Sequence, residues 1–121
     1  MAEVNPLGKI VLVVDDEDAV REVLALHLGQ AGYRAVTAAD AFQALALAAA
    51  EPRPDAVLLD LQMPGPDGWH LLKRFPGIPV VVTTGAGLTA EWAASEGCAG
   101  FLGKPVSREA LLAELRRVLG E

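Results

Sequence analysis

The chain has 121 residues, the size of a single domain, and its hydrophobic fraction of 52% excludes an intrinsically disordered protein. The net charge of −6 argues against nucleic acid as a direct partner, because binding phosphates needs a clustered positive surface. A single cysteine, Cys98, excludes an internal disulfide framework. No signal peptide or membrane span is predicted, since the longest uncharged run, 75–90, is broken by prolines and glycines. We therefore expect a cytoplasmic domain that does not act on membranes.

The first half of the chain alternates strands with helices. An unbroken aliphatic run at 10–14 predicts a strand buried on both faces. A helix is predicted from Asp18, placed to cap it, to about Gly29, with Arg21 on its solvent side. Its apolar residues recur at helical spacing: Val20, Val23, Leu24 and Leu28. A second strand is predicted at 33–38, and Asp40 opens a second helix.

In the second half, a third aliphatic run ends abruptly on Asp60, and a turn rich in proline and glycine follows. A short helix is predicted at 69–75 and a fourth strand at 79–84. A brief helix at 91–96 precedes a fifth strand at 100–103. Ser107 is placed to cap the last helix. The inner face of that helix is apolar: Leu111, Leu112, Leu115, Val118 and Leu119.

This alternation of strand and helix is typical of a parallel α/β protein with right-handed crossovers. We predict a flavodoxin-like (βα)5 fold in three layers, with a parallel five-stranded sheet of order 2-1-3-4-5. In this order the first and third strands are neighbours. Their carboxyl ends then form the edge at which ligands bind in open α/β sheets.

Polar residues follow the predicted strands at this edge. Asp15 and Asp16 follow the first strand and Asp60 ends the third, while Thr84 and Lys104 end the fourth and fifth. Three carboxylates in one place raise one another's pKa unless a cation lies among them. Oxygen ligands favour a hard divalent ion, Mg²⁺ or Mn²⁺. The sequence therefore predicts a metal site at this edge.

The same residues suit phosphoryl transfer to a carboxylate. Asp60 is the predicted nucleophile, because a carboxylate can form an acyl phosphate. The metal and Lys104 would neutralise charge on the phosphoryl oxygens, and the Thr84 hydroxyl would donate a hydrogen bond to one of them. Gly85 has no side chain, so we expect it to leave the approach to Asp60 open.

Taken together and in order, these residues resemble the receiver (CheY-like) domain of bacterial two-component response regulators over 9–119. The motifs that carry the resemblance are Val14-Asp15-Asp16-Glu17, the run from Leu58 to Gly68 around Asp60, Thr84-Gly85, and Phe101-Leu102-Gly103-Lys104-Pro105. We accordingly expect residues 1–121 to form one receiver domain with no output domain.

The resemblance implies that Asp60 accepts phosphate from a histidine kinase or a histidine phosphotransfer protein. It implies that Asp16, Asp60 and the backbone carbonyl of Gln62 bind Mg²⁺ directly, with Asp15 assisting through water. Lys104 falls on the lysine of the family, and the peptide bond before a proline such as Pro105 is often cis in its members.

Thr84 and Phe101 fall on the switch positions of the family. Phosphorylation would change a surface made by the fourth helix, the fifth strand and the last helix, which would bind a downstream protein or a second copy. Phe101 lacks the hydroxyl of a tyrosine, so we expect burial to favour its inward rotamer even at rest. The segments 68–79 and 84–104 are shorter than usual, which predicts reduced third and fourth helices.

Two alternatives stay open. A degenerate receiver would keep the fold and act as an adaptor that does not depend on phosphorylation. The run Asp16-Glu17-Asp18-Ala19-Val20 also resembles the haloacid-dehalogenase-type phosphatases, with Asp16 as nucleophile of a small Mg²⁺-dependent enzyme, although such enzymes are normally larger. We expect a switch that catalyses only its own phosphorylation and hydrolysis, without turnover of an external small molecule.

Overall fold

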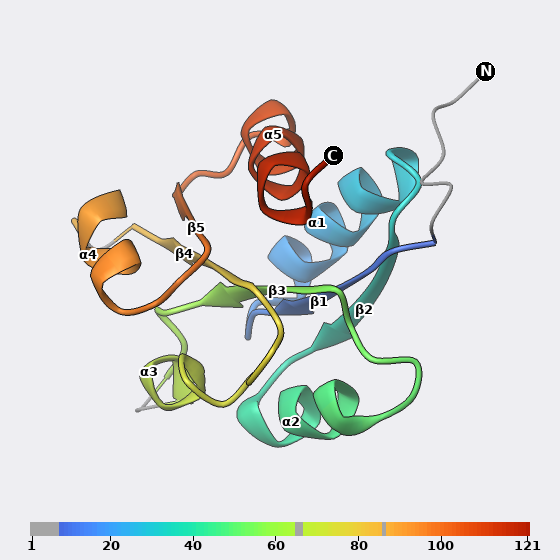
Figure 1. The fold of residues 1–121 in the computed structure, drawn as a ribbon, viewed down its shortest axis with the longest axis horizontal. Helices are drawn as coiled ribbons and strands as arrows, with labels where there is room; N and C mark the ends of the chain where they lie inside the picture. Colours follow the sequence, from blue (N-terminus) through green and yellow to red (C-terminus); the bar gives the residue numbers. More distant parts are fainter. Residues whose placement is uncertain (1–7, 65–66, 86) are drawn as a thin grey trace.

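The computed structural model describes residues 8–64, 67–85 and 87–121 (Figure 1). In these ranges five strands pair in parallel in the order β2-β1-β3-β4-β5. The strands are β1 (Ile10–Val14), β2 (Arg34–Ala38), β3 (Ala56–Asp60), β4 (Val80–Thr84) and β5 (Gly100–Gly103). The predicted fold class and strand order are therefore confirmed. The turn residues Gly65 and Pro66, the loop residue Ala86 and the N-terminal residues 1–7 of the predicted domain lie outside the described ranges.

A helix follows each strand, and the helices cover both faces of the sheet. They are α1 (Asp18–Gln30), α2 (Ala41–Ala49), α3 (Asp67–Leu71), α4 (Ala90–Ser95) and α5 (Arg108–Leu119). Figure 1 shows α1 and α5 above the sheet and α2 and α3 below it. Helix α4 belongs with the lower helices, because its Ala93 packs in the same apolar cluster as Ala44 and Leu71.

The sheet divides the core into two apolar clusters, one on each face. Every residue of β1, β3 and β4 is buried, as strands covered on both faces require. Alternate residues of β1 point to opposite faces: Val11 and Val13 pack with α1 and α5, whereas Leu12 and Val14 pack with α2, α3 and α4. The two clusters fix the strand register and hence the edge at which β1 and β3 end together.

Helix α1 begins differently from the prediction. Asp18 is its first helical residue, and the N-cap is Glu17, whose side chain makes no capping hydrogen bond. Asp18 instead pairs with Arg21, one turn further along the helix. At the other end the Gly32 N–H donates to Gly29 O at 3.0 Å, with Gly32 at φ 93°, where glycine is favoured. Gly32 therefore ends the helix, close to the predicted end at about Gly29.

Two residues of α1 lie on a different side from the one predicted. Val23, predicted to be buried, is 50% exposed beside the loop that follows β5. Arg21, predicted to face solvent, folds back over the β1–α1 loop and is only 16% exposed in its side chain. Periodicity identifies the helix, but the outer boundary of its buried stripe depends on neighbouring loops.

Helices α3 and α4 are short, as expected from the shortened segments. Helix α3 begins two residues before the predicted 69–75 and ends at Leu71, so the predicted bounds were wrong. Gly68 lies against the backbone of β3: a Cβ there would be 2.8 Å from Asp60 O. Trp69, which is 49% exposed, meets Trp92 of α4 edge to face, with ring centroids 5.2 Å apart. This contact joins the two short helices.

The other predicted caps are present. Asp40 accepts a hydrogen bond from Gln43 N at 2.8 Å, and Ser107 accepts one from Ala110 N at 3.1 Å. No helix within the described ranges is both long and apolar enough to cross a membrane.

Candidate functional site

The predicted site residues meet at the carboxyl edge of the sheet. Asp15 follows β1 and its N–H donates to Ala38 O, which continues the pairing of β1 with β2. Asp60 is the last residue of β3 and pairs with Thr83 of β4. Both carboxylates are almost fully buried, with exposures of 1% for Asp15 and 2% for Asp60. The backbone of a buried sheet therefore holds both of them in place.

Asp15, Asp16 and Asp60 form one acidic cluster. One carboxylate oxygen from each residue lies within 4.8 Å of the others. Asp15 Oδ1 accepts a hydrogen bond from Glu17 N at 2.9 Å, whereas its buried Oδ2 has no hydrogen-bond partner among the described residues. An unsatisfied buried carboxylate oxygen is costly, and a cation would satisfy it. The oxygen donors present fit a hard divalent ion such as Mg²⁺.

The pKa of Asp15 is raised above its ordinary value of 3.8. Burial is the main cause, opposed by the hydrogen bond from the backbone of Glu17, and the charge of Asp60 raises the pKa further. The nearby ammonium of Lys104 acts in the opposite direction. Burial and the charge of Asp60 therefore outweigh the stabilisation that Glu17 and Lys104 give to the ionised Asp15 carboxyl.

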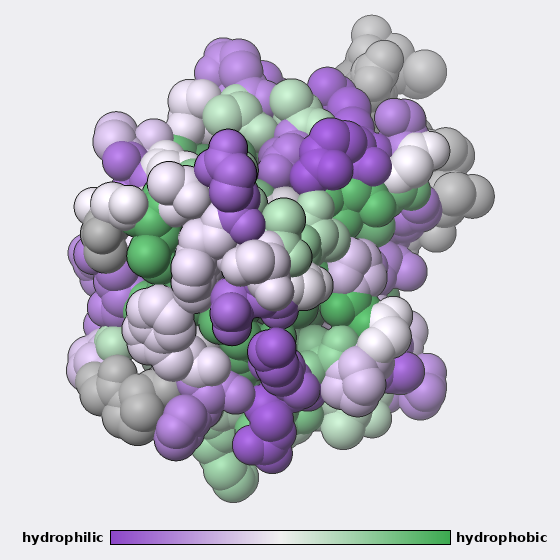
Figure 2. Space-filling model, turned by 60° about the vertical axis from the view of Figure 1, so that its left-hand side comes forward, coloured by the Kyte–Doolittle hydropathy of each residue, from purple (hydrophilic) through white to green (hydrophobic). Residues whose placement is uncertain are grey.

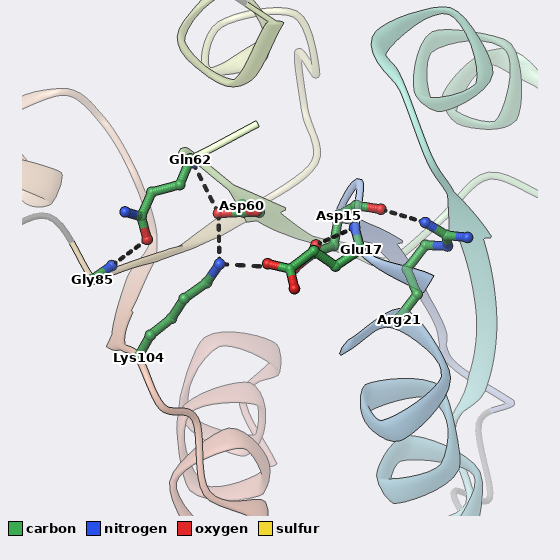
Figure 3. A network of polar contacts seen from close by, with 7 residues as sticks. All are labelled: Asp15, Glu17, Arg21, Asp60, Gln62, Gly85 and Lys104. Atoms are coloured by element: carbon green, nitrogen blue, oxygen red, sulfur yellow. Dashed lines mark hydrogen bonds and ion pairs between the residues drawn. The ribbon is translucent and has the colours of Figure 1, made fainter. Parts of the chain in front are cut away.

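Lys104 links the two buried carboxylates. Its Nζ lies 3.0 Å from Asp60 Oδ1 and 4.0 Å from Asp15 Oδ2, and Figure 3 shows it between them. Its backbone N–H donates to Thr84 O at 3.0 Å, so the end of β5 is tied to the end of β4. The Lys104–Pro105 peptide bond is cis. The lysine charge is thus directed at Asp60.

Two donors converge on one oxygen of Asp60. Oδ1 accepts both from Lys104 and from the backbone N–H of Gln62, the latter at 2.8 Å. These two contacts hold the Asp60 carboxylate in place at the end of β3.

The side chain of Gln62 has a contact that the sequence analysis missed. Its Oε1 accepts a hydrogen bond from Gly85 N at 2.7 Å (Figure 3). A Cβ at Gly85 would lie 3.3 Å from this oxygen. The Gln62 side chain therefore lies beside Gly85, and the expectation that Gly85 leaves the approach to Asp60 open stays a prediction. The only sequence signal is a long amide side chain two residues after a strand-end carboxylate.

Arg21 is a second missed residue. Its guanidinium donates to Asp15 O at 2.7 Å (Figure 3). It also pairs with Asp18. These contacts fix the loop that carries Asp15 and Asp16. A basic residue one turn into a helix that follows an acidic strand end is the signal that could have identified it.

The predicted switch residues lie beside the site. Thr84 ends β4 and is 2% exposed. Phe101 of β5 is partly buried and packs against the cluster formed with α2, α3 and α4. Its N–H donates to Glu114 Oε2 of α5 at 2.9 Å. Phe101 therefore touches the apolar cluster through its ring and α5 through its backbone.

Comparison with known proteins identifies the family to which the chain belongs. The model of the response regulator receiver domain matches residues 11–116. Response regulator MprA of Mycobacterium tuberculosis is 38% identical over 115 residues, covering 90% of this chain and 50% of that protein. The phosphate regulon transcriptional regulatory protein PhoB of Pseudomonas aeruginosa is 34% identical, covering 93% and 52%. The chain spans about half the length of the curated relatives it matches.

Solved structures agree with this assignment. The chemotaxis protein CheY4 of Vibrio cholerae superposes with a TM-score of 0.81 at 33% identity, covering 92% of this chain and 98% of that one. A response regulator receiver protein from Burkholderia phymatum gives a TM-score of 0.81 at 32% identity, covering 93% and 95%. Fold and strand order define a CheY-like α/β protein. The chain belongs to the response regulator receiver domain family of two-component systems, whose members typically bind Mg²⁺ at an acidic pocket.

Proposed function

We propose that Asp60 is the phosphoacceptor of a two-component or phosphorelay system. The observation that carries this proposal is the position of Asp60. It is a buried carboxylate at the end of β3, with one oxygen 3.0 Å from Lys104 Nζ and with Asp15 and Asp16 beside it. A buried acid next to both a cation and an acidic cluster is typical of a reactive site rather than a structural one.

The reaction is a phosphoryl transfer. A carboxylate oxygen of Asp60 attacks the phosphorus of a phosphohistidine, an O–P bond forms, and the P–N bond of the donor breaks. The departing imidazole takes a proton from solvent. Later attack by water on the acyl phosphate releases inorganic phosphate and regenerates the carboxylate. We propose no other substrate and no turnover of an external small molecule.

Each residue of the site has its own role in the proposed reaction. Asp15, Asp16, Asp60 and the backbone carbonyl of Gln62 would hold Mg²⁺, which when bound neutralises charge on the phosphoryl oxygens. Lys104 supplies a second positive charge, already directed at Asp60. The Thr84 hydroxyl would donate to a phosphoryl oxygen.

We propose that the protein donor docks on a groove next to the site. The groove has a volume of about 550 Å³ and runs between the start of α1 and the loop that follows β5. Its apolar wall includes Val20, Val23, Pro105 and Val106, and Asp15 and Lys104 lie at its polar end. A helix of the donor that covers this wall would bring its histidine close to Asp60.

The output surface would be α4, β5 and α5, as in the family. Phosphorylation would draw Thr84 toward the phosphoryl group, and Phe101 would then fill the space beside β4. In Figure 2, which brings the α3 and α4 side of the molecule forward, the hydrophobic residues are seen as separate areas between hydrophilic ones. A downstream protein or a second copy would therefore need polar as well as apolar contacts on this side.

Incubation with acetyl phosphate and Mg²⁺, followed by intact-mass analysis, tests the proposal. The wild-type protein should gain one phosphoryl group that hydroxylamine removes, and Asp60→Asn should gain none. A label that survives in Asp60→Asn and is lost in Asp16→Asn would support the phosphatase alternative. Output binding that is unchanged when the wild type is fully phosphorylated would support an adaptor that does not depend on phosphorylation.

A further inference from the structure

We propose that the Gln62 side chain partly blocks the phosphoryl site of the resting protein and is displaced when a phosphoryl group binds. In the resting protein it occupies the backbone N–H of Gly85, which a phosphoryl oxygen on Asp60 would otherwise use. This inference rests on the proposed phosphorylation of Asp60. It makes Gln62 a residue that sets how readily the site accepts an oxyanion, through its side chain and independently of its backbone carbonyl.

Contacts at both ends of Gln62 place its side chain between Asp60 and Gly85. The backbone N–H of Gln62 donates to Asp60 Oδ1 at 2.8 Å, and its side-chain Oε1 accepts from Gly85 N at 2.7 Å. Lys104 borders the same space, because its Cβ lies 3.6 Å from where a Cβ of Gly85 would be and its Nζ contacts Asp60. The N–H of Gly85 therefore lies within one side-chain length of the carboxylate that receives the phosphoryl group (Figure 3).

The three donors differ in what they hold. Lys104 Nζ and Gln62 N both bind Asp60 Oδ1, which is charged, whereas Gly85 N binds a neutral amide oxygen. Hydrogen bonds to an ionised acceptor are roughly twice as strong as bonds between neutral groups. A phosphoryl oxygen would therefore displace the amide, but binding of the anion is weakened by the loss of the Gln62–Gly85 bond.

Removing the acceptor without removing the bulk tests this directly. Gln62→Met keeps the length of the side chain and the backbone carbonyl but cannot accept a strong hydrogen bond. With beryllofluoride and Mg²⁺ as the probe, we expect its affinity to rise by about 2- to 10-fold, the range that one net hydrogen bond supplies.

Gly85→Ala provides an independent route to the same effect. The new Cβ would sit 3.3 Å from Gln62 Oε1, close enough to require a shift of that oxygen, while the N–H of residue 85 is kept. Beryllofluoride should bind this variant more tightly than wild type. In a double-mutant cycle, Gln62→Met should then add little in the Gly85→Ala background, because both changes remove one interaction.

A matched control removes a similar hydrogen bond in which no proposed site residue takes part. Gln43 Oε1 accepts a hydrogen bond from Ala39 N at 2.9 Å at the start of α2, so Gln43→Met removes the same kind of contact there. This variant should bind beryllofluoride as wild type does. In ¹⁵N spectra of the wild type, the side-chain NH₂ signals of Gln62, identified by their absence in Gln62→Met, should shift when beryllofluoride is added.

The outcomes separate the two proposals. Unchanged or weaker beryllofluoride binding in Gln62→Met, with wild-type binding intact, overturns the proposed blocking role of the Gln62 side chain and leaves the phosphoacceptor proposal standing. Additive effects in the double-mutant cycle also overturn it. If the wild type neither binds beryllofluoride nor gains phosphate on Asp60, the proposed function fails first.

Discussion

The backbone N–H of Phe101 donates a hydrogen bond to Glu114 Oε2, and the two atoms are 2.9 Å apart. Phe101 belongs to β5 and Glu114 to α5, so the carboxylate satisfies a backbone donor of a strand at the edge of the sheet. Arg117 completes the link, because it donates to Glu114 Oε1 at 2.9 Å and to Ala99 O at 2.7 Å. The last helix is thus fastened to the strand that carries the predicted switch residue.

The Glu114 carboxylate should make stability depend on acid pH. The hydrogen bond from Arg117 is the main reason that its pKa lies below 4.5, assisted by the N–H of Phe101 and opposed by partial burial. A lowered folded-state pKa contributes stability above 4.5, which is lost as the pH falls through the folded-state pKa. Denaturant unfolding of Glu114→Gln should show a loss of about 1–2 kcal/mol at neutral pH and a shallower decline in acid. Equal pH profiles for both proteins would contradict this assignment.

Tyr33 should titrate at unusually high pH. Burial is the main cause of a pKa raised to about 12, and the Glu121 carboxylate, which accepts a hydrogen bond from the hydroxyl at 2.7 Å, is the second cause. Tyr33 is the one tyrosine in the sequence, so the phenolate absorbance reports on it alone. A raised folded-state pKa means that stability is present below the ordinary value of 10.0 and is lost as the pH rises toward 12.

Variants of this contact separate its parts. Glu121→Gln should lower the Tyr33 pKa toward its ordinary value, while burial keeps it above 10.0. Tyr33→Phe should remove the corresponding alkaline loss of stability. A wild-type phenolate that titrates near 10 would show that the hydroxyl is solvated.

Magnesium should stabilise the fold through the acidic cluster. Folding raises the pKa of Asp15, so the protonated carboxyl contributes to the stability of the fold below pH 3.8, and this contribution is lost as the carboxyl ionises. The charged form of Asp15 therefore destabilises the fold at neutral pH. Asp16→Ala and Asp15→Asn should each raise the stability of the metal-free protein, by about 1 kcal/mol for Asp15→Asn. Both should also weaken the thermal shift caused by Mg²⁺. A shift of wild-type size in Asp16→Ala would place the metal elsewhere.

The groove beside α1 should matter for a protein donor and not for a small one. Val23→Asp places a charge on its apolar wall, where the valine is already 50% exposed and folding should be little affected. Phosphorylation by a histidine kinase should slow by about 10-fold, because docking would desolvate the new carboxylate. Phosphorylation by acetyl phosphate should keep its wild-type rate.

Leu26→Asp is the matched control for the groove. Leu26 is 58% exposed on the same helix but does not line the groove. It should leave both reactions unchanged. Equal losses in the two variants would indicate a general effect of charge on α1 rather than docking in the groove.

The sequence predicted the positions that backbone topology determines. Asp60 and Lys104 could be brought to one edge because each ends a strand, and parallel strands end together. It failed where long side chains choose among several partners. Arg21 and Gln62 each contact a residue across a loop. Neither the spacing of residues nor hydrophobic periodicity predicts which rotamer such a side chain adopts. The cap of α1 was misplaced by one residue because Glu17 and Asp18 are both acidic.

Gly68 couples the position of α3 to the position of Asp60. Its backbone lies against the carbonyl of Asp60, where even a methyl group would be 2.8 Å from that oxygen. The first turn of α3 therefore lies directly against the end of β3. Any side chain at residue 68 would push the helix and the strand end apart, so the close approach of these two elements requires glycine at this position.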